Sequence, residues 1–155
     1  MRTYFIPLSA GLALAGSAFL PWVVVGDISL RGVPDGAGLW VLGLGALAAV
    51  LAVLSLVTRK NSRHPLLVVG LMALGVMGLS WRLLPRLAVE RALTVSQAFA
   101  IVEDQPVGTA PPAALAGSGI YVGLAAAAII VAFGLTIVFK RASTPYIIAP
   151  ADDDV

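Results

Sequence analysis

The sequence predicts an all-α integral membrane protein: a four-helix bundle with an extra amphipathic helix in its second outer loop. Four long apolar runs carry this prediction, and they cover residues 5–25, 39–57, 66–84 and 120–139. A helix that crosses a bilayer needs about 20 apolar residues, because each residue adds about 1.5 Å and the hydrocarbon layer is about 30 Å thick. All four runs reach that length, and the one ionisable residue inside them is Arg82.

Composition supports the same class of protein. Hydrophobic residues make up 59% of the chain and charged residues 12%, against about 45–50% and ~25% in soluble domains. We expect residues 1–141 to form one membrane domain and residues 142–155 to form an acidic cytoplasmic tail. The absence of cysteine excludes disulfides, iron–sulfur clusters and c-type haem attachment. The few charges flank the apolar runs instead of forming a basic stripe, which argues against a nucleic-acid partner.

Tryptophan marks the ends of three of the apolar runs. Trp22 lies near the end of the first run, Trp40 near the start of the second and Trp81 near the end of the third. The segment between the first two runs, residues 26–38, contains the turn sequence Pro34-Asp35-Gly36 and predicts a tight reversal. Because indole favours the lipid headgroup zone, we expect all three rings to lie at one interface, in contact with lipid or a partner.

Small residues spaced by four form stripes that let helix backbones approach closely. The stripes comprise Gly11 and Ala15 in the first run, Gly45 and Ala49 in the second, and Gly119, Gly123 and Ala127 at and after the start of the fourth. The sequence predicts close helix packing there, and it leaves open whether the partner helix belongs to the same chain or to another subunit.

Charge reappears at the end of the third run. Arg82, Arg86 and Glu90 are spaced by four, with Pro85 between the first two. We expect a break near Pro85, an amphipathic helix over residues 86–101 lying on the outer membrane surface, and an extended or loop segment over residues 102–119. Two interpretations of the arginines stay open. Either Arg82 extends to the interface while Arg86 pairs with Glu90, or the arginines anchor a lipid phosphate, an acidic partner or an anionic substrate.

Basic residues also predict the topology. Six of them flank the ends of the runs on one side: Arg2, Arg59, Lys60, Arg63, Lys140 and Arg141. Short cytoplasmic loops are enriched in Lys and Arg. Both termini and the turn at residues 58–65 are therefore expected on the cytoplasmic side of a bacterial inner membrane, in a multi-pass protein.

The candidate chemistry is sparse. The single histidine, His64, lies in a polar turn, and no catalytic constellation, metal-ligand set or cofactor motif accompanies it. We expect no enzyme activity, no cofactor and no metal. The predicted function is that of a non-catalytic accessory subunit or assembly factor of a larger bacterial inner-membrane complex, with respiratory and photosynthetic complexes as candidate hosts. Its expected partners are other membrane subunits and lipids. The alternative is a small channel or transporter formed by oligomerisation.

Two resemblances accompany these patterns. Phe19-Leu20-Pro21-Trp22, followed by Asp35-Gly36 and a Gly/Leu/Ala-rich run, resembles the opening of small uncharacterised bacterial four-helix membrane proteins over about 40 residues. Trp22 with Gly38-Leu39-Trp40 also resembles the tryptophan and Gly-Leu-Trp signature of claudin-like tetraspan proteins. That family has two cysteines after the signature and a long first extracellular segment, from which this sequence departs. Neither resemblance implies a catalytic residue.

Overall fold

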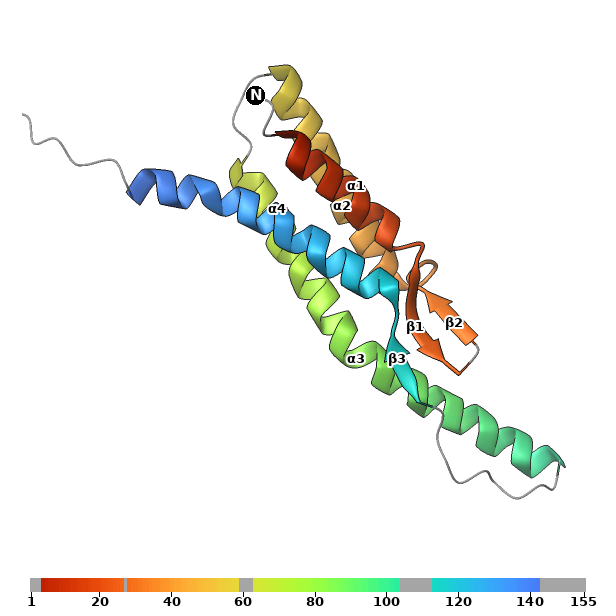
Figure 1. The fold of residues 1–155 in the computed structure, drawn as a ribbon. Coiled ribbons are helices and arrows are strands. Elements are labelled where there is room, and N and C mark those ends of the chain that lie inside the picture. Colours follow the sequence, from red (N-terminus) through yellow and green to blue (C-terminus); the bar gives the residue numbers. More distant parts are fainter. Residues whose placement is uncertain (1–3, 27, 59–62, 104–112, 143–155) are drawn as a thin grey trace, which may run out of the picture.

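The computed structural model describes residues 4–26, 28–58, 63–103 and 113–142 and is mostly helical (Figure 1). The elements in chain order are the helix α1 (Phe5–Ser17), the strands β1 (Pro21–Val25) and β2 (Ile28–Arg31), the helices α2 (Gly36–Thr58) and α3 (Arg63–Glu103), the strand β3 (Ala114–Ala116) and the helix α4 (Ser118–Ala142). Of the predicted acidic tail, residues 143–155 lie outside the described residues.

The four helices pack side by side. The helix α1 contacts α2 and α4, while α3 contacts α4 and α2. Figure 1 shows the start of α1, the end of α2 and the end of α4 directed away from the three strands, which gather at the opposite end of the bundle. Among the described residues, three helical segments are long and apolar enough to cross a membrane: Gly36–Thr58, His64–Val95 and Ser118–Thr136. The fourth, α1, has 13 residues and covers only about 20 Å.

The first apolar run is therefore not one helix. The prediction of a helix over residues 5–25 was wrong, because α1 ends at Ser17 and Pro21–Val25 forms a strand. Hydropathy cannot distinguish an apolar helix from an apolar strand that is buried on both faces. The local signal was available, since Pro21 cannot donate a helical hydrogen bond and the following run Val23 to Val25 is β-branched, which favours a strand.

The strands form one antiparallel sheet in the order β2-β1-β3, so the described part of the protein is mostly helical with four helices, as predicted, but it is not all-α. Val23 lies opposite Leu30 and Ala116, and Val25 lies opposite Ile28 and Ala114. Residues directly opposite one another project to the same face of a sheet. We call this face the inner face, because Val23 belongs to the hydrophobic core and Val25 and both alanines pack against it.

The third apolar run continues without a break into the second outer segment. We predicted a break near Pro85 and a separate helix over residues 86–101, but α3 runs from Arg63 to Glu103 with Pro85 inside it. Figure 1 shows that α3 changes direction along its length and that its later part projects beyond the bundle. A proline inside a helix commonly bends the axis without ending the helix. The predicted loop over residues 102–119 likewise contains β3 and the start of α4.

Candidate functional site

Trp22 links the sheet to the helical bundle. Its side chain is 1% exposed, and its indole Nε1–H donates a hydrogen bond to the Ser17 carbonyl oxygen at 2.8 Å. A Cβ atom added to Gly32 would lie 2.5 Å from the ring carbon Cε2, and one added to Gly119 would lie 2.6 Å from Cδ1. The ring thus fits between two glycines. The structure places Trp22 inside the protein and not at the lipid-facing surface where we expected it.

Three other aromatic side chains are exposed near this level of the bundle. Trp40 on α2 is 66% exposed, Trp81 on α3 50% and Tyr121 on α4 56%. The strand β1 and the starts of α2 and α4 meet at Trp22. Gly119 of α4 packs directly against its ring, and Gly32 packs against both the ring and the backbone of Gly38 in α2.

The part of α3 that carries Trp81 lies near the same level of the bundle as Trp22. Gly123 of α4 packs against Met77, one helical turn before Trp81. Exposed aromatic rings on three helices at one level are typical of a membrane–water boundary. We call Trp40, Trp81 and Tyr121 the aromatic ring set.

The small-residue stripes pack within the chain. A Cβ atom added to Gly45 would lie 2.5 Å from the Ala15 nitrogen, and one added to Gly11 would lie 2.8 Å from the Ala49 nitrogen, so the backbones of α1 and α2 nearly touch. On α4, Gly119 faces Trp22, Gly123 faces Met77 and Ala127 is fully buried. Of the two partners that the sequence left open, the structure shows helices of the same chain packing against these stripes.

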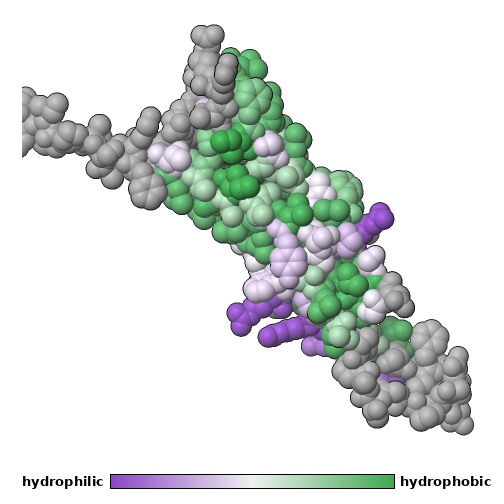
Figure 2. Space-filling view, in the orientation of Figure 1, coloured by the Kyte–Doolittle hydropathy of each residue, from purple (hydrophilic) through white to green (hydrophobic). Residues whose placement is uncertain are grey.

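The arginines at the end of the bundle lie on the surface. Arg82, Arg86 and Glu90 are all exposed. The side chains of these three residues make no ion pair or hydrogen bond with the part of the chain that the structure describes, so the pair between Arg86 and Glu90 is not formed there. Asp27, which follows β1 in the sequence and is a candidate partner of Arg82, lies outside the described residues. Figure 2 shows hydrophilic side chains gathered near the level of the strands and a hydrophobic surface over the bundle.

Sequence reasoning missed an exposed apolar surface on the sheet. Ile28 is 67% exposed and Leu30 48% exposed, and both belong to the inner face by their register with Val25 and Val23. The helix α3 packs against β1 and β3, whereas the contacts of β2 are mainly with β1. We call Ile28 and Leu30 the uncovered inner face. The alternation in Ile28-Ser29-Leu30-Arg31 was the available signal, but the segment was interpreted as a turn.

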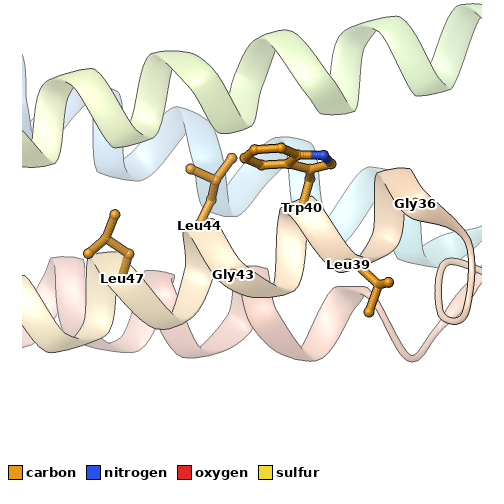
Figure 3. Close-up of a pocket in the computed structure, with 6 residues that line it drawn as sticks. All are labelled: Gly36, Leu39, Trp40, Gly43, Leu44 and Leu47. Atoms are coloured by element: carbon orange, nitrogen blue, oxygen red, sulfur yellow. The ribbon is translucent and has the colours of Figure 1, made fainter.

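A shallow groove of about 410 Å³ lies along α2 and is lined by Gly36, Leu39, Trp40, Gly43, Leu44 and Leu47. Figure 3 shows the side chains of Trp40 and Leu44 on the same side of α2 and that of Leu39 on the opposite side. Gly43 leaves open space, since nothing lies within 4 Å of an added Cβ atom. The lining holds aliphatic and indole groups, which suit an apolar chain better than a polar substrate.

Few polar groups accompany these surfaces in the interior. Among the described residues, the buried polar side chains are Ser17, Ser55 and Ser80, and Ser17 donates from Oγ to the Leu14 carbonyl oxygen at 2.6 Å. No group of three or more His, Asp or Glu side chains that would suit a metal ion occurs in the part of the chain that the structure describes. No protein-family model, curated protein or solved structure matches this chain significantly.

Proposed function

We propose that this chain is a non-catalytic accessory subunit or assembly factor of a larger complex in a bacterial inner membrane. In this arrangement the sheet and the projecting part of α3 lie outside the membrane, and both termini lie in the cytoplasm. Thr58 lies eighteen positions after Trp40, and at a rise of about 1.5 Å per position this distance is about 27 Å, close to the thickness of the hydrocarbon layer. The aromatic ring set then marks the outer boundary.

The uncovered inner face is the observation that carries the proposal. The inner face of β1 and β3 packs on the core and on α3, but at β2 the same face continues as exposed Ile28 and Leu30. In the proposed placement these side chains lie beyond the aromatic ring set, outside the lipid hydrocarbon. Apolar side chains that cluster on an ordered, water-facing surface commonly mark a protein interaction site. A partner that covers β2 would complete the layer that α3 begins.

The expected partner is another membrane subunit, since this surface stands next to the membrane boundary. The small-residue stripes support the same function, because they hold the helices together within the chain and leave its outer surface for lipid and partners. Respiratory and photosynthetic complexes are the candidate hosts.

The test compares two aspartate variants on neighbouring positions of β2. Ile28→Asp places a charge on the uncovered inner face, whereas Ser29→Asp places the same charge on the opposite face of the same exposed strand. Each variant and the wild type are extracted from native membranes in mild detergent and analysed by native gel and mass spectrometry. We expect stoichiometric co-migration with a larger complex for the wild type and Ser29→Asp, and its loss for Ile28→Asp.

Migration of the wild type alone or as a small homo-oligomer would contradict the accessory function and favour the channel alternative. Equal co-migration of all three proteins would retain the accessory function but exclude the uncovered inner face as its contact surface.

A further inference from the structure

One exposed face of α3 combines two cations with two aliphatic side chains at the proposed membrane boundary. Residues three and four apart on a helix are surface neighbours, with Cβ atoms about 5–6 Å apart. Leu79, Arg82, Leu83 and Arg86 satisfy this spacing, and all four are exposed. Trp81 of the aromatic ring set lies next to Arg82 in the chain. We call these four residues the α3 outer face.

We propose that the α3 outer face binds an anionic phospholipid of the outer leaflet, with its phosphate held between Arg82 and Arg86. Like charges four residues apart on a helix destabilise it, and neither guanidinium group makes an ion pair with the described part of the chain. An anion between them removes this repulsion. A phosphodiester suits the position, because guanidinium groups bind phosphate oxygens through paired, charge-assisted hydrogen bonds.

The direction of α3 brings the arginines to the right depth. In a helix, side chains tilt toward the N-terminus of their own helix, and α3 runs from the proposed cytoplasmic end toward the sheet (Figure 1). Arg82 and Arg86 therefore lean back toward the membrane from positions at and just beyond the aromatic ring set. Phosphate groups lie at that depth, between the hydrocarbon layer and water.

The two leucines of the α3 outer face favour binding of a lipid over binding of a free anion. Leu79 is 60% exposed and Leu83 42% exposed, and both lie on the membrane side of Arg86. Leu79 and Leu83 would contact an acyl chain whose phosphate is held by the arginines. Burial of apolar area then adds to the electrostatic attraction. The inference rests on the proposed placement in a membrane but not on the proposed accessory function.

The experiment uses the full chain reconstituted in nanodiscs that contain equal amounts of phosphatidylglycerol and phosphatidylcholine. After mild delipidation, native mass spectrometry measures the ratio of the two lipids that remain bound. The test variant is Arg82→Gln/Arg86→Gln. The control is Arg31→Gln/Arg91→Gln, which removes the same charge from two other exposed arginines at the same end of the molecule. Circular dichroism and size-exclusion chromatography monitor folding.

We expect the wild type and the control to retain phosphatidylglycerol preferentially. The preference should fall about fivefold for each arginine removed from the α3 outer face, as for basic residues near an anionic surface. No preference in the wild type, an unchanged preference in the test variant, or an equal loss in the control would each overturn the proposal.

A conservative variant keeps the test decisive if the glutamine variant does not fold. Arg82→Lys/Arg86→Lys keeps both charges but removes the forked donor geometry, so part of the preference should be lost. An unchanged preference in a folded lysine variant would overturn the assignment to paired guanidinium groups. Because co-migration with a partner complex is measured separately, failure here is distinguishable from failure of the proposed function.

Discussion

Trp22 is the residue on which the junction of sheet and bundle depends. It lies in β1, donates a hydrogen bond to the carbonyl at the end of α1, and packs between glycines that precede α2 and begin α4. One buried side chain thus connects four segments of the chain. Its large buried area and its single satisfied donor make it a stabilising contact and not a lipid anchor.

Replacing this indole should destabilise the protein. We expect Trp22→Phe to lower the free energy of unfolding by about 1–3 kcal/mol, because it removes the buried hydrogen bond from the indole N–H to the Ser17 carbonyl oxygen and leaves part of the space of the larger ring unfilled. Trp40→Phe is the matched control, since Trp40 is 66% exposed, and its effect should stay within about 0.5 kcal/mol. Denaturant unfolding in detergent, followed by circular dichroism, measures both. Equal effects of the two substitutions would contradict the structural function of Trp22.

The tryptophans also show what sequence could predict at this scale. Trp22 stands near the end of one apolar run and Trp40 near the start of the next, and position alone does not distinguish their environments. What separates them is tertiary, because Gly32 and Gly119 are distant in sequence yet come together around Trp22. The amphipathic indole satisfies its N–H at the headgroup level or against a protein carbonyl equally well, so pattern alone does not decide between the two.

At the scale of elements, the packing of α1 on α2 depends on small residues. Gly11 and Ala15 of α1 face Gly45 and Ala49 of α2 so closely that a new methyl group would meet backbone atoms. Such contact replaces the hydrophobic drive that is missing between helices in lipid. The stripes themselves were predicted from the sequence, and the structure identifies their partners as helices of the same chain.

A pair of alanine substitutions on α2 tests this packing. Gly45→Ala should destabilise the protein by about 1–3 kcal/mol, because the added Cβ atom would lie 2.5 Å from the Ala15 nitrogen and force the helices apart. Gly43→Ala places its methyl group in open space and should leave stability unchanged or raise it by up to about 1 kcal/mol through helix propensity. Thermal unfolding in detergent compares them. A neutral Gly45→Ala would refute the close approach of α1 and α2.

The sequence predictions failed at element boundaries, and each failure has its own local cause. Mean hydropathy reports burial, not backbone conformation, so the strand at Pro21–Val25 was merged with the helix before it. Pro85 was interpreted as an end of a helix, although a helix that is supported by neighbouring segments continues through a proline. The β-strand at Ala114–Ala116 is too short to show an alternating pattern, and it forms only because β1 lies beside it.

For the whole molecule, we predict one definite orientation across the membrane. The strands lie at the opposite end of the bundle from the end of α2 and the start of α3 (Figure 1), and the basic residues in sequence between these two helices favour the cytoplasm. The helical class and the helices that are long enough to span a membrane followed from composition and hydropathy. The sheet and its exposed surface did not, because they require contacts between segments that are distant in sequence.

The absence of cysteine makes this orientation simple to test. Ser29→Cys lies on the exposed strand β2, and His64→Cys lies at the exposed start of α3. We expect a membrane-impermeant maleimide to label Ser29→Cys in spheroplasts, and to label His64→Cys only after the membrane is opened. The reverse pattern would invert the proposed topology, and labelling of both in sealed spheroplasts would argue against a membrane barrier between these two sites.

We propose above all that the uncovered inner face of β2 contacts another subunit. A photo-crosslinking amino acid placed at Ile28, activated in native membranes, tests it most directly, with the same probe at Ser29 as the control on the opposite face. We expect one discrete crosslink from position 28 to a different membrane protein and a much weaker one from position 29. Crosslinks only to lipid or to a second copy of this chain, or equal products from both positions, would contradict it.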